Sequence, residues 1–132
     1  MSIFSSKTEH LSLGARGEKA AVNYLKKCNY KILATNFFNP KGRRLGEIDI
    51  IAKDGKELVF IEVKTRKSSS ANVILPEENV TRSKLYKLNK TAYFYLSKNG
   101  LLDAPYRFDA LAILANPENN HCTIKHFKNI FL

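Results

Sequence analysis

The fold of this chain is decided by the stretch Leu45-Gly-Glu-Ile-Asp-Ile-Ile-Ala-Lys-Asp-Gly-Lys-Glu-Leu-Val-Phe-Ile-Glu-Val-Lys64, which has the pattern of a β-hairpin. Two alternating segments flank Asp54-Gly55, a dipeptide that favours a two-residue turn because the central positions of that turn need positive φ. With this dipeptide at the tip, the predicted cross-strand pairs are Ile51 with Leu58, Asp49 with Phe60, and Glu47 with Glu62.

Four charged residues of this hairpin are expected on one face, because strand side chains alternate between faces. They are Glu47, Asp49, Glu62 and Lys64. Like charges that lie directly opposite each other destabilise a sheet, so a divalent cation between them is the natural counter-charge. The alternative for any single residue is a solvated outer face. Apolar residues share the face near the turn, which favours a covered surface that opens at the far end, with the acids at its mouth.

Length and composition predict one compact domain over residues 1–132, with residues 1–9 flexible. The 132 residues are 44% hydrophobic, which suffices for a single core. Lys and Arg number 22 against 12 acids, a net charge of +10. This excess favours a polyanionic partner, with nucleic acid ahead of a membrane surface. A merely soluble basic protein is the alternative.

Several classes of protein are disfavoured by what the sequence lacks. Residues 1–10 have no apolar core typical of a signal peptide, and no run approaches the length of a membrane span. We therefore expect a cytoplasmic protein without a membrane partner. The two cysteines and three histidines form no metal-ligand spacing, and neither a glycine-rich phosphate loop nor a nucleophile elbow is present.

An amphipathic helix is predicted from about His10 to Cys28 by apolar residues at helical spacing. Glu18 lies seven residues from both Leu11 and Leu25, nearly the same angular position, so this helix directs a carboxylate where an apolar side chain is expected. The functional interpretation is a further metal ligand or an orienting carboxylate. Alternatively, the helix begins only after Gly17 and Glu18 is an exposed acid of its first turn.

The remaining elements give the order α-β-β-β-α-β-β. A strand is predicted over residues 30–38, the hairpin follows, and Thr81 caps a second helix that runs to about Lys98. Two last strands are predicted over residues 106–114 and 122–131. Asp109 interrupts an apolar strand, but Arg107 lies on the same face two residues away, so we interpret the two as a structural ion pair outside the site.

Basic segments are expected beside the acids, at the open end of the hairpin. Such cations hold a nucleic-acid backbone by releasing its counter-ions, whereas solvated loops are the ordinary alternative. The candidate nucleic-acid-binding residues are Lys41, Arg43 and Arg44 before the hairpin, Arg66 and Lys67 after it, and Lys84 on the basic face of the second helix.

Asp49, a spacer of 12 residues and Glu62-Val63-Lys64 resemble the core motif of the restriction-endonuclease-like PD-(D/E)xK superfamily. A wider pattern is similar to the YraN-like family, an uncharacterised bacterial family of predicted endonucleases. It comprises Gly14-x-x-Gly17-Glu18-x-x-Ala21, Asn36, Gly46-Glu-Ile-Asp-Ile-Ile-Ala52, Val59-Phe-Ile-Glu-Val-Lys-Thr-Arg66 and Arg107-Phe-Asp109. The likeness runs from about residue 12 to the end of the chain.

This resemblance implies an α/β fold with a restriction-endonuclease-like core, in which helices flank a mixed five-stranded sheet. It implies Asp49 and Glu62 as ligands of Mg²⁺ or Mn²⁺, with Glu47 as a further candidate ligand. Lys64 would lie near the attacking water, and Glu18 would be a helix-borne catalytic acid. Two departures from the pattern are Ile48, where the superfamily's nominal proline would stand, and residues 68–75, which lack the usual glycine-containing loop.

The expected activity is metal-dependent hydrolysis of phosphodiester bonds, because a hard cation activates water and stabilises charge on the phosphate. A domain this small has no visible module for reading base edges, which favours structure-directed cutting of DNA, as in Holliday junction resolvases. A homodimer would suit a symmetric junction. The alternatives are a non-catalytic nucleic-acid-binding protein that retains the nuclease fold, and an RNA-processing nuclease.

Overall fold

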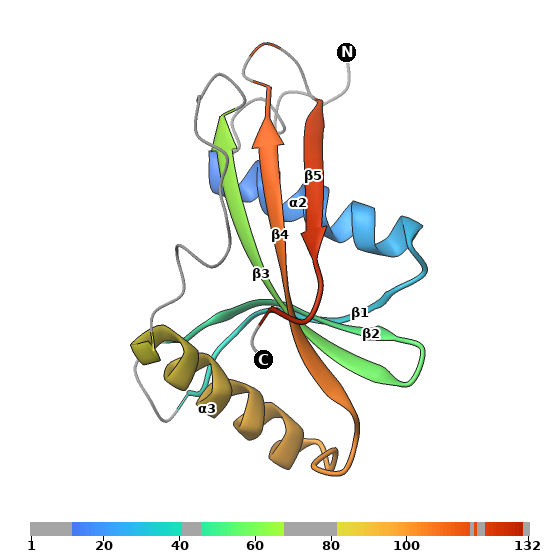
Figure 1. Ribbon diagram of the computed structural model, residues 1–132, viewed down its shortest axis with the longest axis vertical. Helices are drawn as coiled ribbons and strands as arrows, with labels where there is room; N and C mark the ends of the chain where they lie inside the picture. The colour runs from blue at the N-terminus through green and yellow to red at the C-terminus, as the bar shows by residue number, and fades with distance from the viewer. Residues whose placement is uncertain (1–11, 41–45, 68–81, 117, 119–120, 131–132) are drawn as a thin grey trace.

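The computed structural model describes residues 12–40, 46–67, 82–116, 118 and 121–130. Its helices and strands follow the predicted order (Figure 1). They are α2 (Leu13–Lys27), β1 (Lys31–Phe37), β2 (Ile48–Asp54), β3 (Glu57–Lys67), α3 (Arg82–Lys98), β4 (Tyr106–Ala115) and β5 (Cys122–Phe127). The last strand is shorter than predicted. The predicted cap Thr81 and residues 1–9 lie outside the described residues.

The five strands form one mixed sheet in the order β1-β2-β3-β4-β5. Strands β1, β2 and β3 pair antiparallel as a meander, β3 and β4 pair parallel, and β5 returns antiparallel to β4. Parallel neighbours need a long crossover, and α3 lies in the connection between β3 and β4. The sheet is strongly twisted, with α2 across the end where β3, β4 and β5 lie side by side and α3 near the other end (Figure 1).

Two apolar cores cover the two faces of the sheet, as strand alternation requires. Helix α2 buries Ala21 and Leu25 against one face, where it meets alternate residues of β2, β3 and β4. Helix α3 buries Leu88, Ala92 and Leu96 against the other. The strand residues of this second core include Ile51, Leu58 and Phe60. The acid-bearing face of the hairpin is therefore covered near the turn, as predicted.

The predicted hairpin register is wrong by two residues. Asp54 pairs with Glu57, so the turn consists of Gly55 and Lys56, and Ile51 lies opposite Phe60 rather than Leu58. Gly55 has φ of +63°, which suits the first central position of a type II′ turn. A shift of two residues preserves the alternation, so Ile51, Leu58 and Phe60 share one core as predicted. Ile48, predicted on the opposite face, packs in that same core, and Glu47 and Glu62 are no longer the expected direct pair.

Arg107 supplies the physical reason for the observed register. The paired residues Asp54 and Glu57 are like charges, which destabilise a sheet when they lie opposite each other. The Arg107 guanidinium lies 3.3 Å from Asp54 Oδ2 and 2.5 Å from Glu57 Oε1. A cation between opposed acids was expected at Glu47 and Glu62, whereas at the turn it is provided by a side chain of β4.

Helix α2 begins before Gly17, which rejects the alternative of a helix that starts after it. Ser12 is the N-cap, and its hydroxyl accepts a hydrogen bond from the Ala15 N–H at 3.1 Å. The buried stripe of the helix consists of Gly17, Ala21 and Leu25, so Glu18 lies beside that stripe and is partly buried. Neither described helix is long and apolar enough to cross a membrane.

Candidate active site

The candidate site lies where β2 and β3 stop pairing, at the end of the hairpin away from the turn. The last paired residues are Ile50 and Ile61. Beyond this pair, the Val63 N–H of β3 donates a 2.7 Å hydrogen bond to the side chain of Asp49, at Oδ2, instead of to a backbone carbonyl of β2. The carboxylate of Asp49 is thus held against the neighbouring strand at the point where the ladder ends.

Asp49 lies in an acidic environment that disfavours its own charge. Burial is the main cause, and the nearby charges of Glu62, Glu18 and Glu47 add to it. The Val63 N–H partly compensates, and the pKa of Asp49 rises to about 6. The structure thereby brings the four predicted carboxylates of the site within electrostatic reach of one another.

Glu62 forms ion pairs with two lysines of the site. Its Oε1 lies 3.4 Å from Lys64 Nζ, and the ammonium of Lys84 on α3 also forms an ion pair with it. Burial would lower the pKa of Lys84, but the bond to Glu62 and the charge of Asp49 raise it above its ordinary value. Lys84, predicted to face a nucleic-acid backbone, therefore belongs to the acidic cluster in this structure.

Glu18 is oriented by a residue of β1. The side-chain amide of Asn36 donates a 2.7 Å hydrogen bond to Glu18 Oε1. Asn36 has φ of +52°, a left-handed conformation that asparagine tolerates better than most residues. Its side chain thus holds the helix-borne acid beside the sheet.

Gly17 allows α2 to approach β3 next to this acid. A Cβ atom at Gly17 would lie 1.8 Å from Thr65 Oγ1, whereas one at Gly14 would meet nothing within 4 Å. No other residue type fits at Gly17 unless the helix or the strand moves. The closeness of Glu18 to the site therefore depends on its neighbour having no side chain.

We expect Gly17→Ala to lower the free energy of unfolding by about 1–2 kcal/mol, because overpacking exceeds the gain in helix propensity. Gly14→Ala on the same helix is the matched control and should raise it by up to about 1 kcal/mol. Urea denaturation of both variants checks the difference. Equal stabilisation by the two substitutions would contradict the close helix-strand contact.

Glu47 precedes β2 and follows a constrained glycine. Gly46 has φ of +79°, and a Cβ atom there would lie 2.6 Å from the Lys87 carbonyl oxygen of α3. This contact brings the segment that leads into β2 against α3. A cavity of about 10 Å³ is bordered by Glu47 and Glu62, roughly the space that one water molecule occupies.

The donor chemistry of the cluster suits a hard divalent cation, which prefers carboxylate oxygens. Burial of Asp49 among like charges is also the condition that a bound cation would relieve. Within the described residues, however, no three His, Cys, Asp or Glu side chains are grouped so that they could hold a metal ion as they stand. Glu62 is instead bound by the Lys84 ammonium.

The other candidate nucleic-acid-binding residues are only partly covered by the structure. Arg66 and Lys67 are exposed at the end of β3, beyond Glu62 and Lys64 on the same strand. Lys41, Arg43 and Arg44 lie outside the described residues.

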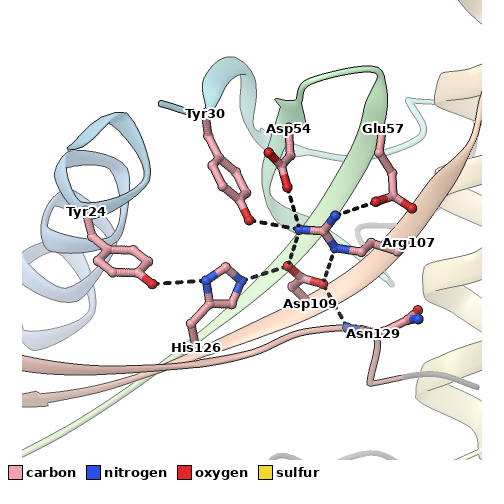
Figure 2. A network of polar contacts seen from close by, with 8 residues as sticks. All are labelled: Tyr24, Tyr30, Asp54, Glu57, Arg107, Asp109, His126 and Asn129. Carbon is pink, nitrogen blue, oxygen red and sulfur yellow. Dashed lines mark hydrogen bonds and ion pairs between the residues drawn. The ribbon is translucent and has the colours of Figure 1, made fainter. Parts of the chain in front are cut away.

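A second polar cluster surrounds Asp109, which is fully buried (Figure 2). Arg107 Nε donates to Asp109 Oδ1 at 3.0 Å, which confirms the predicted ion pair. His126 Nε2 lies 2.7 Å from Asp109 Oδ2, and the Asn129 N–H donates to Oδ1 at 2.9 Å. Tyr24 and Tyr30 complete the network through His126 and Arg107. It joins α2, the hairpin turn, β4 and β5, which is a structural role.

Sequence reasoning missed two contacts that shape the candidate site. The first is the orientation of Glu18 by Asn36, which stood in the family pattern without a role. The second is the ion pair between Lys84 and Glu62. An ion pair between a lysine of α3 and a partly buried acid of β3 has no local signature in the sequence, because the two residues lie in different segments of the chain. The left-handed Asn36 had a weak signal, since asparagine is enriched in that conformation.

Comparison with known proteins places these residues in a family. Residues 17–113 match the model of the uncharacterised protein family UPF0102. The chain is 42% identical over 127 residues to a UPF0102 protein of Geotalea uraniireducens, which covers 95% of this chain and 93% of that protein. It is 43% identical over 120 residues to a UPF0102 protein of Clostridium botulinum, and the match covers 90% of this chain and 93% of that protein. A UPF0102 protein of Geobacter sulfurreducens is 42% identical, and the match covers 90% of this chain and 88% of that protein.

Proposed function

Because this chain belongs to the UPF0102 family, the YraN-like family that its motifs indicate, and that family is uncharacterised, we propose an activity from the residues themselves. The protein is a metal-dependent endonuclease with a restriction-endonuclease-like core. One observation carries this proposal: the Asp49 carboxylate is buried beside Glu62, Glu18 and Glu47 at the point where β2 and β3 separate. A structural role alone gives no reason to gather four acids in a chain of net charge +10.

Asp49 and Glu62 would hold Mg²⁺ or Mn²⁺, with Glu47 as a further oxygen donor. When bound, such an ion supplies a Lewis acid for the phosphate and lowers the pKa of a water molecule. The Val63 N–H fixes the orientation of the Asp49 carboxylate through Oδ2. Glu18, held by Asn36, is the positioning acid at the edge of the cluster.

Lys64 and Lys84 would contact the scissile phosphate. Both ammonium groups form ion pairs with Glu62, and a compact ammonium suits the negative charge that develops on a phosphodiester under attack. In the protein without substrate, Lys84 balances the charge of Glu62. A cation held at Glu62 would balance that charge in its place and would leave the Lys84 ammonium available to the phosphate.

The preferred substrate is branched or unpaired DNA. The protein is small and basic, and within the described residues we find no element that projects into a groove to read base edges. Phosphate contacts by Lys64, Lys84, Arg66 and Lys67 carry no sequence information. Recognition would then follow the shape and flexibility of the nucleic acid.

The test is a cleavage assay of the wild-type protein on junction, flap, single-stranded and duplex DNA and on matched RNA. We expect endonucleolytic products from branched or single-stranded DNA with Mg²⁺ or Mn²⁺, and none with EDTA. The rival function, a non-catalytic nucleic-acid-binding protein, predicts salt-sensitive binding that is indifferent to metal. Tight binding without cleavage of any substrate would favour that rival. Cleavage confined to RNA would identify an RNA-processing nuclease.

A further inference from the structure

Helix α3 carries two tyrosines on its outward surface that the core does not use. Tyr86 and Tyr93 are each 62% exposed, although tyrosine rings usually bury most of their area. Their spacing of seven residues places them on one face of the helix. A groove of about 470 Å³ runs between them, within the roughly 300–1,000 Å³ range of ligand pockets. Its lining residues are Asn39, Tyr86, Asn89, Lys90, Tyr93, Phe94 and Ser97.

Ring contacts with β1 hold the floor of this aromatic groove in place. The Phe94 ring is stacked on Phe37 of β1 with centroids 6.1 Å apart, and Phe37 in turn meets Tyr95 edge to face at 5.1 Å. Phe94 is thereby tied to the core beneath α3. A rigid aromatic floor loses little conformational entropy when a flat ligand binds.

The charge of α3 is complementary to a polyanion. Its 17 residues include five Lys or Arg and no Asp or Glu. Lys90 Nζ lies 4.9 Å from the centroid of the Tyr86 ring, and Lys98 Nζ lies 6.0 Å from that of Phe94. Cations therefore alternate with aromatic rings along α3, with Lys90 in the groove itself, and proteins bind single-stranded nucleic acid with this combination.

We propose that this groove binds single-stranded nucleic acid by stacking unpaired bases on Tyr86 and Tyr93, with Lys90 beside the backbone. The proposal deepens the nuclease function and rests on it in one respect: the bound strand is the substrate of the acidic cluster. Lys84, which forms the ion pair with Glu62, precedes Tyr86 by only about 3 Å along the helix axis but lies on nearly the opposite side of the helix. The backbone at Lys87 also abuts Gly46, which precedes Glu47. One helix thus carries both the groove and a residue of the site, and a strand that reaches both passes around this helix.

The binding experiment uses fluorescence anisotropy in EDTA, so that no strand is cut. The probes are a short oligothymidine, an abasic strand of equal length and a duplex. We expect the double variant Tyr86→Ala/Tyr93→Ala to bind oligothymidine at least about tenfold more weakly than the wild type, with abasic binding changed by less than about twofold. The matched control Tyr86→Phe/Tyr93→Phe keeps both rings and should bind as the wild type does. Both tyrosines are exposed, and circular dichroism checks that each variant is folded.

A second arm separates charge from stacking. Lys90→Gln should weaken binding of oligothymidine and of the abasic strand alike, and should reduce the slope of log affinity against log salt by about 0.7. Lys125→Gln, an exposed lysine of β5 outside the groove, is the control and should leave the slope nearly unchanged.

Several outcomes would overturn the groove proposal. One is that the double alanine variant loses affinity for oligothymidine and for the abasic strand equally. Another is that the wild type binds the two strands with the same affinity. A dimer in sedimentation that dissociates on Tyr86→Ala would instead show that a second copy occupies the groove. Because binding is measured without metal, a failure of the nuclease proposal leaves this result intact. Conversely, cleavage of single strands that is unaffected by the double alanine variant would retain the nuclease and reject the groove as the place where its substrate binds.

Discussion

Asp49→Asn is expected to lose metal-dependent cleavage on the order of 1,000-fold while making the metal-free protein more stable. The loss follows from the proposed function, in which a neutral amide would replace a charged metal ligand worth several kcal/mol of transition-state stabilisation, and each 1.4 kcal/mol is tenfold in rate. The gain in stability follows because the ionised carboxylate is buried among Glu62, Glu18 and Glu47. The amide oxygen can still accept the Val63 N–H, so the local fold is kept.

The stability gain should depend on pH in a direction set by the raised pKa of Asp49. That pKa is about 6 in the folded protein against an ordinary value of 3.8. Below pH 3.8 the group is protonated in both states and the substitution gains nothing. Between the two values the penalty on the wild type grows, and above about pH 6 Asp49→Asn should be more stable by about 2 kcal/mol, after allowance for solvent screening.

Thermal and urea denaturation of the wild type and Asp49→Asn from pH 4 to 8 measures this difference, with Asp103→Asn as an exposed control. Added Mg²⁺ should stabilise the wild type and not the variant, since only binding to the folded state raises stability. An Asp49→Asn protein that is less stable than the wild type at pH 8, or that cleaves at the wild-type rate, would contradict the assignment.

Asp109→Asn is expected to lower the free energy of unfolding by about 2–3 kcal/mol, because it removes the fully buried anion of the Arg107 guanidinium and leaves only the more exposed Asp54 and Glu57 to pair with it. Asp109 has no exposed surface, and only 10% of the Arg107 side chain is exposed. Asp54→Asn removes an acid that lies 3.3 Å from the same guanidinium but is 40% exposed, so its expected cost is below about 1 kcal/mol. Urea denaturation at pH 7 compares the two variants.

The stability difference between the wild type and Asp109→Asn should depend on pH with the opposite sign from the difference for Asp49→Asn. Burial alone would raise the pKa of Asp109, but hydrogen bonds from His126, Arg107 and the Asn129 N–H lower it below 3.8. The stabilisation that the ionised Asp109 provides is therefore complete above the ordinary pKa of an aspartate, and it is lost as the pH falls through the pKa of Asp109 in the folded protein. The gap between the wild type and Asp109→Asn should be constant near neutral pH and should narrow below about pH 4. Equal costs for Asp54→Asn and Asp109→Asn would show that the network is not a buried ion pair.

Periodicity in the sequence was sufficient for the parts of the fold that depend on neighbours along the chain. The alternation over residues 47–52 and 58–64 predicted that Ile51, Leu58 and Phe60 share one face, and that prediction survived an error of two residues in the register because strand side chains repeat every two residues. The order of elements also followed from local patterns. Arg107 and Asp109, two residues apart on one strand face, were predictable as a pair for the same reason.

Contacts between distant segments were decided only by the tertiary structure. The register of the hairpin follows the position of Arg107, which comes from β4 and neutralises the opposed Asp54 and Glu57. The partners of Glu62 and Glu18 come from α3 and β1, and the bare backbone at Gly17 sets how near α2 lies. Local spacing carries no information on such pairs, because their energy depends on burial and on charges that the fold brings together. By itself, the sequence determined which residues face which way, and packing determined which of them meet.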